Sequence, residues 1–432
     1  MAYSRKDLAI NGGPKAKTTK NLPMFPGGLE IGREEKKEVL QVLKNRYLFR
    51  YYGPKESPSK VKALEELYAR FTGSKHALAL NSCTSALISA LVAAGIGPGD
   101  EVIIPSYTFF ATCAAVVAAR AIPIVAEVDG SLTMDPADFE KKITTRTKAV
   151  IPVHMRGMPA RIDRIVEIAR KKGIIVIEDV AQANGGTYKG KPLGSFGDIG
   201  CFSLQFHKII TSGEGGVLVT NSDLLYTRAQ AYHDVAACWR KDRFAPPEFE
   251  GEIFFGVNFR MSELTGAVAL AQFRKLDSIL SRMRRNKKLI KDRLQGLPGI
   301  TFRDVTDAQG DTAICLVFYL AAPGQVEEFV KALHAEGVEA GGIYDKGVPD
   351  WHIYPHWKML IDKMMPTKKG CPFNCAQSGS VPDYKADDCP RTMEWLGRSV
   401  HLDIPPQLRE KDCAQIAEAI RKVASVLLEG KG

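Results

Sequence analysis

Short apolar runs alternate with amphipathic segments along the first half of the 432-residue chain. The run at 173–179 is continuously apolar until it ends in Glu178 and Asp179, as expected of a strand that is covered on both faces. Similar runs lie at 77–80, 101–105, 122–128 and 149–154. Strands that alternate with helices are typical of parallel sheets, because each parallel strand needs a crossover before the next. The order therefore predicts an α/β fold with a mostly parallel, doubly wound sheet and helices on both faces.

The length of the chain predicts two packed units. Residues 1–28 are polar and punctuated by Gly and Pro, which predicts an N-terminal arm. The break Gly-Leu-Pro-Gly at 296–299 divides a large domain, 29–295, from a smaller C-terminal domain, 296–432. The pattern beyond the break, a strand at 314–320 and a helix at 326–336, predicts an α+β unit.

Composition narrows the class of protein. No apolar run approaches the ~20 residues that span a bilayer. The N-terminal residues lack the apolar core of a signal peptide. Nine cysteines, an odd number scattered in mostly apolar surroundings, suit a reducing compartment better than a disulfide framework. We therefore expect a cytoplasmic protein with no membrane partner.

The net charge of +10 favours anionic partners. Basic residues are spread along the chain, and the local concentration at 282–291 suits the solvated face of a helix. No stacking-aromatic or basic-arm motif accompanies them, so we expect an anionic small substrate and no nucleic acid. His352 and His356 are four residues apart, but Pro355 lies between them and no Cys-x-x-Cys pair is present. We therefore expect no metal site.

Lys208 lies between the apolar run 199–204 and a glycine-rich turn at 213–216. A lysine at the end of a buried strand is partly desolvated, and desolvation favours the neutral, nucleophilic amine. An arbitrary lysine beside glycines is more often a surface loop residue, so a catalytic role for Lys208 depends on the residues around it. Asp179 and Gln182 close another buried strand, at the carboxyl end where ligands of doubly wound sheets bind. A buried aspartate that caps the next helix is the alternative for Asp179.

Residues 82–85, Ser-Cys-Thr-Ser, stand where a strand gives way to a helix. The free N–H groups and partial positive charge of a helix N-terminus suit a phosphate. Taken alone, this pattern is an ordinary Ser/Thr N-cap.

Residues 202–216 fit Phe-Ser-x-x-x-x-Lys followed by a glycine-acid-glycine-glycine turn, and with Asp179 and Gln182 they resemble the DegT/DnrJ/StrS family of sugar aminotransferases. The resemblance covers the chain from about residue 29 and implies the type I aminotransferase fold with pyridoxal phosphate (PLP) as cofactor. It implies that Lys208 binds PLP covalently, in register with Ser203. It also implies that Asp179 keeps the pyridine nitrogen protonated and that Gln182 reaches the phenolic oxygen.

The same resemblance assigns further cofactor contacts. Cys83 and Thr84 would contact the phosphate, although Cys83 stands where the family has Gly or another small residue. Phe109 would stack on the pyridine ring, or is otherwise a core phenylalanine. Asn258, in Phe-Gly-Val-Asn-Phe-Arg, matches the family's Gly-x-Asn-x-Arg motif and would reach the phosphate in the neighbouring subunit. The active unit would therefore be a homodimer with shared sites.

Substrate contacts are expected from His154, Trp351 and His352. His154 follows a predicted strand; a lone histidine there is often structural, but similar enzymes have one that lines the site. Trp351 and His352 belong to a cluster of aromatics and histidines at 344–357 that suits either a substrate loop or plain packing.

The resemblance implies ping-pong transamination of a keto-sugar, with glutamate or glutamine as amino donor and Lys208 as general acid/base. One alternative is a PLP-dependent sugar dehydratase, in which histidine replaces the lysine. His207 prompts it, but the register from Ser203 places Lys208 at that position. A non-enzymatic regulatory relative is the other alternative, and the presence of Lys208 and Asp179 argues against it.

Two stretches point to different substrates. The segment 255–311, with Trp351-His352, looks closest to the branch that aminates the 8-position of 3-deoxy-manno-octulosonate. The segment 368–388, with Cys-Pro-Phe-Asn-Cys, looks more like the cyclitol and antibiotic-sugar branches. The resemblance thus leaves open a nucleotide-linked keto-sugar, a keto-sugar acid such as 8-oxo-3-deoxy-manno-octulosonate, and a cyclitol ketone.

Overall fold

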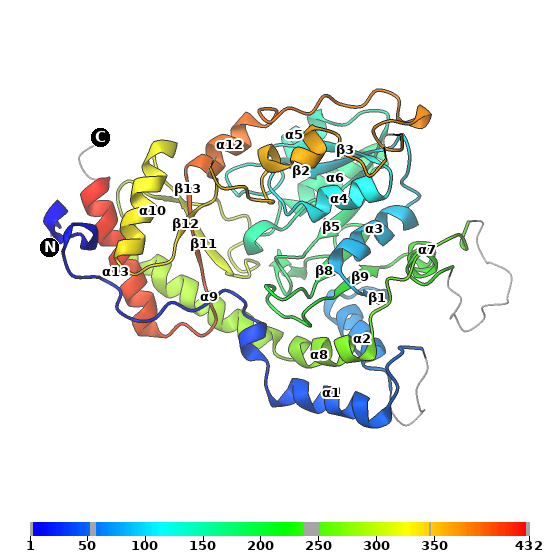
Figure 1. Ribbon diagram of the computed structural model, residues 1–432, viewed down its shortest axis with the longest axis horizontal. Helices are drawn as coiled ribbons and strands as arrows, with labels where there is room; N and C mark the ends of the chain where they lie inside the picture. Colours follow the sequence, from blue (N-terminus) through cyan, green and yellow to red (C-terminus); the bar gives the residue numbers. More distant parts are fainter. Residues whose placement is uncertain (1–2, 52–57, 237–250, 345–346, 368, 429–432) are drawn as a thin grey trace.

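The large sheet of the protein has seven strands, in the order β1-β9-β8-β5-β4-β2-β3 (Figure 1). The structure is a computed structural model that describes residues 3–51, 58–236, 251–344, 347–367 and 369–428. The strands are β1 (His76–Leu80), β2 (Glu101–Pro105), β3 (Ile122–Ala126), β4 (Thr147–Val150), β5 (Ile175–Asp179), β8 (Ile199–Ser203) and β9 (Gly216–Thr220). β9 runs antiparallel to β1 and β8, whereas the other neighbours are parallel. The mostly parallel sheet predicted from the sequence is confirmed.

Helices cover both faces of this sheet because its strands are apolar on both sides. Along β9, Val217 and Val219 join one buried cluster while Leu218 joins the other. The first cluster contains α2 (Lys60–Thr72), α5 (Pro136–Lys141), α6 (Ile162–Lys172) and α8 (Glu263–Phe273). The second contains α3 (Cys83–Ala93), α4 (Ala111–Ala118) and α7 (Asp223–His233). α1 (Arg33–Asn45) packs on α8.

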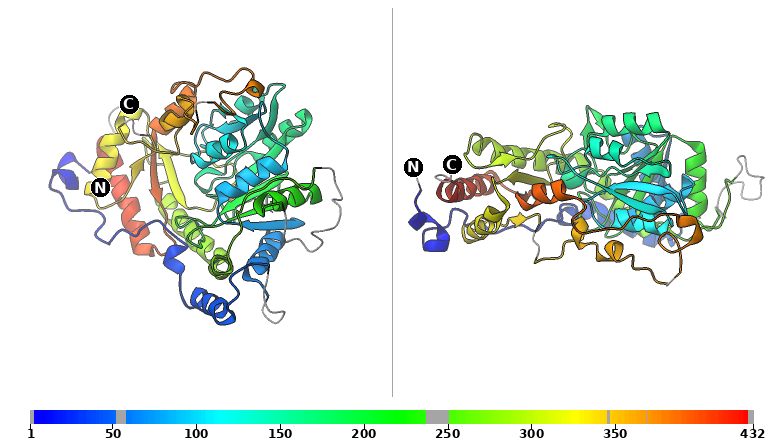
Figure 2. Two further views of the ribbon diagram at one scale, coloured as in Figure 1. Left: turned by 45° about the vertical axis from the view of Figure 1, so that its right-hand side comes forward. Right: turned by 90° about the horizontal axis from the view of Figure 1, so that it is seen from above.

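A second, antiparallel sheet lies in the C-terminal part, in the order β10-β11-β13-β12. Its strands are β10 (Thr301–Phe302), β11 (Cys315–Tyr319), β12 (Gly341–Gly342) and β13 (Ser399–Asp403). α10 (Val326–Ala335), α13 (Glu410–Leu427) and the end of α9 (Leu276–Arg293) share its core. The N-terminal arm packs on this unit (Figure 2): Leu8 is buried in the same core, and Glu336 accepts hydrogen bonds from the backbone of Ala9 and Ala16.

The predicted C-terminal domain is interrupted by a long excursion between β12 and β13. This excursion carries α11 (Lys358–Ile361) and α12 (Pro390–Gly397) and passes over the large sheet in Figure 1. Its residues Tyr354, Trp357 and Tyr384 are buried with α3 and α4 of the large domain. The boundary near residue 296 therefore separates the two sheets, but part of the later chain belongs to the large domain's core.

The remaining short elements of the described residues are η1 (Arg5–Asp7), η2 (Ala9–Asn11), η3 (Gly28–Glu30), η4 (Met155–Gly157), β6 (Thr187–Tyr188), β7 (Lys191–Pro192), η5 (Pro323–Gln325), η6 (Tyr354–His356) and η7 (Ala376–Ser378).

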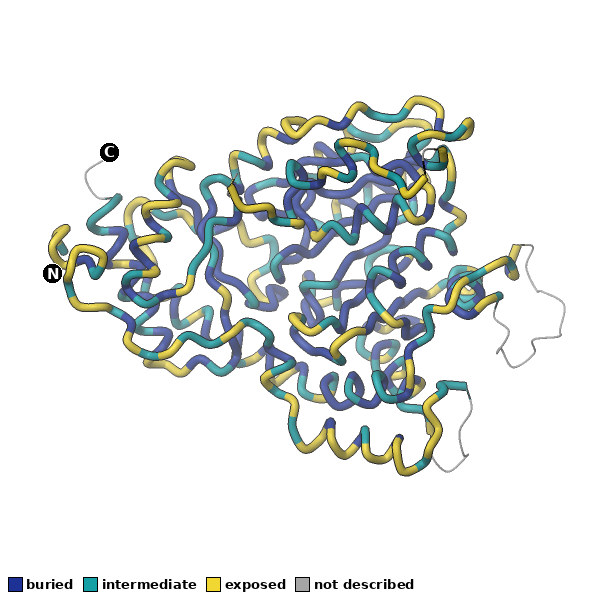
Figure 3. The backbone as a smooth tube through the Cα atoms, in the orientation of Figure 1, coloured by how far each residue is buried: buried dark blue, intermediate teal, exposed yellow. Residues whose placement is uncertain are grey.

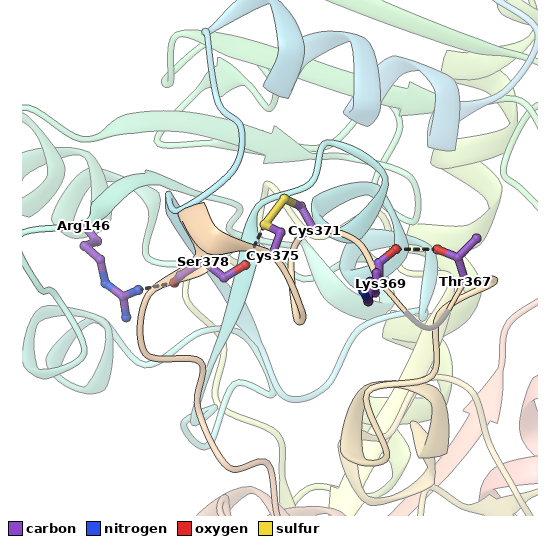
Figure 4. Close-up of a disulfide and its surroundings, with 6 residues drawn as sticks. All are labelled: Arg146, Thr367, Lys369, Cys371, Cys375 and Ser378. Atoms are coloured by element: carbon purple, nitrogen blue, oxygen red, sulfur yellow. Dashed lines mark hydrogen bonds between the residues drawn. A yellow bond between two sulfur atoms is a disulfide. The ribbon is translucent and has the colours of Figure 1, made fainter.

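The excursion also holds a disulfide, which the scattered cysteines of the sequence do not predict. Cys371 and Cys375 are joined, with Cα atoms 5.0 Å apart (Figure 4). Nearby, Arg146 of the large domain donates a hydrogen bond to the carbonyl oxygen of Ser378 at 2.9 Å. Six further cysteines are free and buried, and Cys238 lies outside the described residues. Within the described ranges, no helix combines the length and apolar character that crossing a bilayer requires.

Candidate active site

A cavity of about 650 Å³ opens at the carboxyl ends of β4, β5 and β8. This is the edge at which doubly wound sheets bind ligands. Its walls also include the N-terminus of α3 and the last residue of β13, so both sheets contribute. The cavity brings together most of the residues predicted from the sequence, namely Cys83, Thr84, Phe109, Asp179, Gln182, Ser203, Lys208 and His352.

Asp179 ends β5 and is almost fully buried. One carboxylate oxygen accepts the backbone N–H of Ala181 at 3.0 Å, and the other accepts the hydroxyl of Thr112 at 2.9 Å. Burial raises the pKa of Asp179, while these two hydrogen bonds and the charge of Lys208 oppose the rise. A buried carboxylate of this kind is stabilised by a cationic partner, and a protonated pyridine nitrogen is such a partner.

Lys208 lies in the turn that follows β8. Its backbone N–H donates to the carbonyl of Gln205 at 2.9 Å. Burial lowers the pKa of the Lys208 ammonium, and the nearby Asp179 carboxylate partly opposes this. Among the residues that the structure describes, its ammonium group has no hydrogen-bond or ion-pair partner. The amine is therefore available to a ligand, as the sequence predicts.

The N-terminus of α3 forms a cup that suits a phosphate. Ser82 caps the helix, and its hydroxyl accepts the backbone N–H of Ser85 at 3.0 Å. Gly216, the first residue of β9, packs so closely that a Cβ there would lie 2.4 Å from the carbonyl of Ser82. Burial raises the pKa of the Cys83 thiol well above its ordinary value, so this side chain stays neutral. Cys83 and Thr84 line the cavity at this helix start, where the first N–H groups of a helix are free to bind an anion.

Gln182 is oriented by its carbonyl oxygen, which accepts the backbone N–H of Arg156 at 3.1 Å. Its amide NH₂ is the end left to donate to a ligand oxygen. Phe109 is 47 % exposed, and its ring centroid lies 5.2 Å from that of His352. The two rings flank the cavity together, which excludes a plain core role for Phe109 and places His352 where a substrate contact was predicted.

His154 does not line the cavity, which corrects the expectation of a substrate contact. The ring is fully buried, and Nδ1 accepts the backbone N–H of Ala160 at 3.0 Å. Nε2 lies 3.1 Å from a carboxylate oxygen of Glu178. Both ring nitrogens are thus engaged beneath the site. The backbone N–H of His154 donates to the carbonyl of Asp179 at 3.1 Å, so the residue positions that strand end.

Trp351 does not line the cavity either. Its carbonyl accepts hydrogen bonds from the backbone of Phe110 and from the indole of Trp357, both at 2.9 Å. Its role is to tie the excursion to the loop after β2. Asn258 is exposed and lies outside the cavity of its own chain, with its amide oxygen accepting the N–H of Arg260 at 3.2 Å. The predicted contact of Asn258 with a neighbouring subunit's cofactor stays a prediction.

Two charged residues of the cavity have no motif that could reveal them. Arg156 follows β4, and Asp403 ends β13 of the other sheet, 247 positions later in a segment without a recognisable pattern. One guanidinium nitrogen of Arg156 lies 3.6 Å from a carboxylate oxygen of Asp403. In the part of the chain that the structure describes, no group of three or more His, Cys, Asp or Glu side chains could hold a metal ion.

Residues 29–369 match the DegT/DnrJ/EryC1/StrS aminotransferase family. The chain belongs to this family. As a family member it is a PLP-dependent aminotransferase, and its homologues are sugar aminotransferases. The cavity residues suit this cofactor, because they combine the N-terminus of α3, the buried Asp179 carboxylate and the Lys208 amine.

Several relatives of this family match over most of their length. The spore coat polysaccharide biosynthesis protein SpsC of Bacillus subtilis is 32 % identical over 91 % of this chain and 95 % of its own. The GDP-perosamine synthase of Caulobacter vibrioides is 35 % identical over 71 % and 81 %. An L-glutamine:2-deoxy-scyllo-inosose aminotransferase of Streptoalloteichus tenebrarius is 35 % identical over 68 % and 72 %.

Solved structures confirm the fold of this aminotransferase. DesI, solved with its TDP-sugar product, has a TM-score of 0.75 at 26 % identity, covering 97 % of this chain and 96 % of that one. An aminotransferase from Psychrobacter cryohalolentis has a TM-score of 0.76 at 26 % identity, covering 90 % and 96 %. The type I fold predicted from the sequence is thus confirmed.

Proposed function

We propose that the protein transfers an amino group from glutamate or glutamine to a keto-sugar or a cyclitol ketone. The observation that carries this proposal is the pairing of Lys208 and Asp179 in one cavity. Burial lowers the pKa of the lysine and raises that of the aspartate, so the site holds a reactive amine and a carboxylate suited to a buried cation.

The residues around this pair have separate tasks. PLP, when bound, supplies the electron sink that makes the proton on the substrate carbon removable. Asp179 would hold the ring N–H, and the NH₂ of Gln182 would donate to the ring's phenolic oxygen. The N-terminus of α3 would hold the phosphate, with Ser203 beside it. Phe109 would cover the ring and exclude water.

Lys208 has a second task once its amine is free. In the first half of the cycle its Nζ would take the proton from the carbon that carries the donor's amino group and deliver it to the bound cofactor, and in the second half it would carry a proton from the cofactor to the carbonyl carbon of the acceptor. A lowered pKa suits this task, because the amine then accepts and releases a proton nearer to neutral pH. Donor and acceptor use the same cavity in turn, which leads to ping-pong kinetics.

The substrate class is inferred from relatives whose names state it. GDP-perosamine synthases and glutamine-dependent scyllo-inosose aminotransferases act on a nucleotide-linked sugar and on cyclitols, respectively. We keep 8-oxo-3-deoxy-manno-octulosonate among the candidates, because it unites a keto-sugar with the carboxylate that a basic protein favours. We further propose a homodimer with shared sites, to which Asn258 contributes, and a cytoplasmic location.

Absorbance spectra of the purified protein test the proposal. We expect a band near ~420 nm from the lysine-bound cofactor, moving toward ~330 nm when excess L-glutamate or L-glutamine is added. Lys208→Ala should abolish the ~420 nm band, whereas Lys171→Ala, at an exposed lysine of α6, should leave it intact. The wild-type protein would then be assayed with a panel of keto-sugars, keto-sugar acids and cyclitol ketones.

A spectrum without this band, or a band that Lys208→Ala does not affect, would contradict the aminotransferase proposal. The dehydratase and the non-enzymatic relative would then become the better interpretations. If the band appears but no amino donor changes it, the protein binds PLP and does not transaminate with these donors.

A further inference from the structure

Arg156 is the one arginine among the described residues that line the cavity. It follows β4, whose neighbours in the sheet are β2 and β5. The neighbouring strand ends therefore place Tyr107, after β2, and Gln182, after β5, on either side of it. Arg156 Nε donates to the hydroxyl of Tyr107 at 3.2 Å. The guanidinium thus lies in the same cavity as Lys208, at the edge where the reacting groups are held.

The backbone of Arg156 is held in an unusual conformation. Its φ of 52° and ψ of 39° are in the left-handed region, which non-glycine residues seldom adopt. Its N–H donates to Gln182 at 3.1 Å, and its carbonyl accepts from the guanidinium of Arg303 at 3.2 Å. These contacts fix where the side chain starts, so the guanidinium is positioned before any ligand arrives. Backbone that is held against its preference often marks a functional residue.

The charge of Arg156 is only loosely matched within the chain. Its nearest anionic partner is Asp403, at 3.6 Å, whereas charge-assisted N–H···O bonds are about 2.7–2.9 Å long. The carboxylate of Asp403 is 39 % exposed and comes from the other sheet. A guanidinium prefers a carboxylate that meets it with two parallel hydrogen bonds. The contact with Asp403 does not provide this geometry.

We propose that Arg156 binds a carboxylate of the substrate, and that Asp403 competes with this carboxylate for the guanidinium. The inference rests on the proposed transamination and deepens it, because it states the chemical class that the site selects. The carboxylate has two sources, the amino-acid donor and a keto-sugar acid. A ping-pong enzyme accepts its donor and its acceptor in one cavity, and a donor amino acid and a neutral keto-sugar differ in charge. Asp403 pairs with the Arg156 guanidinium when the substrate in the cavity has no carboxylate.

The binding of glutarate, a dicarboxylate with no amino group, tests the proposal without turnover. Calorimetry on the PLP-loaded protein should show that Arg156→Gln weakens glutarate binding about 10- to 100-fold. Arg156→Lys should restore part of the loss, since lysine keeps the charge but not the planar fork. Asp403→Asn should tighten binding because the competitor is gone. Arg161→Gln, at a half-exposed arginine outside the cavity, is the matched control and should change nothing.

The opposite directions of the two variants separate this role from a structural one. If the pair served only to join the two sheets, Arg156→Gln and Asp403→Asn would both lower the thermal stability and would affect glutarate alike. Equal weakening in both variants, or unchanged binding in Arg156→Gln, would overturn the proposal. Should Arg156→Gln fail to fold, tighter binding by Asp403→Asn still supports the proposal and weaker or unchanged binding refutes it.

Half-reactions then assign the source of the carboxylate. If it belongs to the donor, Arg156→Gln raises the apparent KM for L-glutamate in the ~420 to ~330 nm conversion and leaves the limiting rate nearly unchanged. If it belongs to the acceptor, the donor half-reaction stays normal and only the return step with a keto-sugar acid is weakened. A wild-type protein that binds glutarate through Arg156 but converts no donor would refute the proposed function and retain this inference.

Discussion

The pKa values of Lys208 and Asp179 shift in opposite directions, because burial in the same cavity disfavours the charged form of each. Burial lowers the pKa of Lys208 from its ordinary 10.5, and the Asp179 carboxylate limits the fall. The unfolded chain therefore binds more protons at Lys208 than the folded chain between the lowered pKa and 10.5. The contribution of this group to stability accordingly rises as the pH rises through that window. Below that window, the burial that makes Lys208 reactive therefore lowers the free energy of unfolding.

Reductive methylation of the PLP-free protein, followed by mass spectrometry of the Lys208 peptide, measures this shift. We expect the half-maximal rate at Lys208 below pH 10.5, because methylation needs the neutral amine. Asp179→Asn should move this midpoint to lower pH, since it removes the charge that supports the ammonium. Thr112→Val, which removes one hydrogen bond to Asp179 but keeps its charge, is the control. A midpoint that rises in Asp179→Asn would show that the two groups do not interact as described.

At the scale of elements, the phosphate cup depends on the approach of β9 to the start of α3. A methyl group at Gly216 would lie 2.4 Å from the carbonyl of Ser82 and 2.5 Å from the N of Cys83. Gly216→Ala should therefore cost ~1–3 kcal/mol of unfolding free energy, because backbone has to move. It should also weaken PLP binding, since the displaced residues are those proposed to hold the phosphate. Thermal unfolding and PLP titration by absorbance measure the two effects.

Gly97→Ala is the matched control for Gly216→Ala. A methyl group at Gly97 would meet no other atom within 4 Å, and the φ of this glycine is not left-handed. Its replacement should be neutral or stabilising by at most ~1 kcal/mol. Loss of stability without loss of PLP affinity in Gly216→Ala would show that the packing of β9 supports the fold alone.

The elements that the sequence predicts well are those with a local signal. The strand ends that carry Asp179 and Ser203 follow continuous apolar runs, and α3 begins at a Ser/Thr cap, so their places in one cavity could be predicted. Arg156 and Asp403 could not, because their meeting depends on how two sheets pack rather than on a pattern within either segment. The prediction that His154 lines the site is wrong for a different reason. The residue follows β4 as expected, but its ring is buried against Glu178 of the neighbouring strand β5, and spacing along the chain does not reveal which way the ring turns.

At the scale of the whole molecule, apolar side chains lie exposed on α1 and close in sequence to Asn258. Leu40 and Leu43 are exposed on α1, which forms an exposed edge in Figure 3, while Val42 of the same helix is buried. Phe255, three residues before Asn258, is 99 % exposed. Scattered apolar residues are normal on a surface, but a fully exposed phenylalanine beside the predicted intersubunit residue favours an interface. Asn258 can reach a phosphate only across such an interface, because it lies outside the cavity of its own chain.

Hybrid dimers test the shared site. Lys208→Ala and Asn258→Ala homodimers should each be nearly inactive, because every site lacks one required residue. When the two variants are mixed in equal amounts and exchange subunits, half of the dimers become hybrids. In each hybrid, one site lacks both residues and the other site has both. The mixture should therefore recover roughly a quarter of the wild-type activity. Mixing Lys208→Ala with Asp179→Asn is the control, because both residues come from the same chain and each site of the hybrid stays incomplete. Recovery in the control, or none in the first mixture, would show that Asn258 does not act across the dimer.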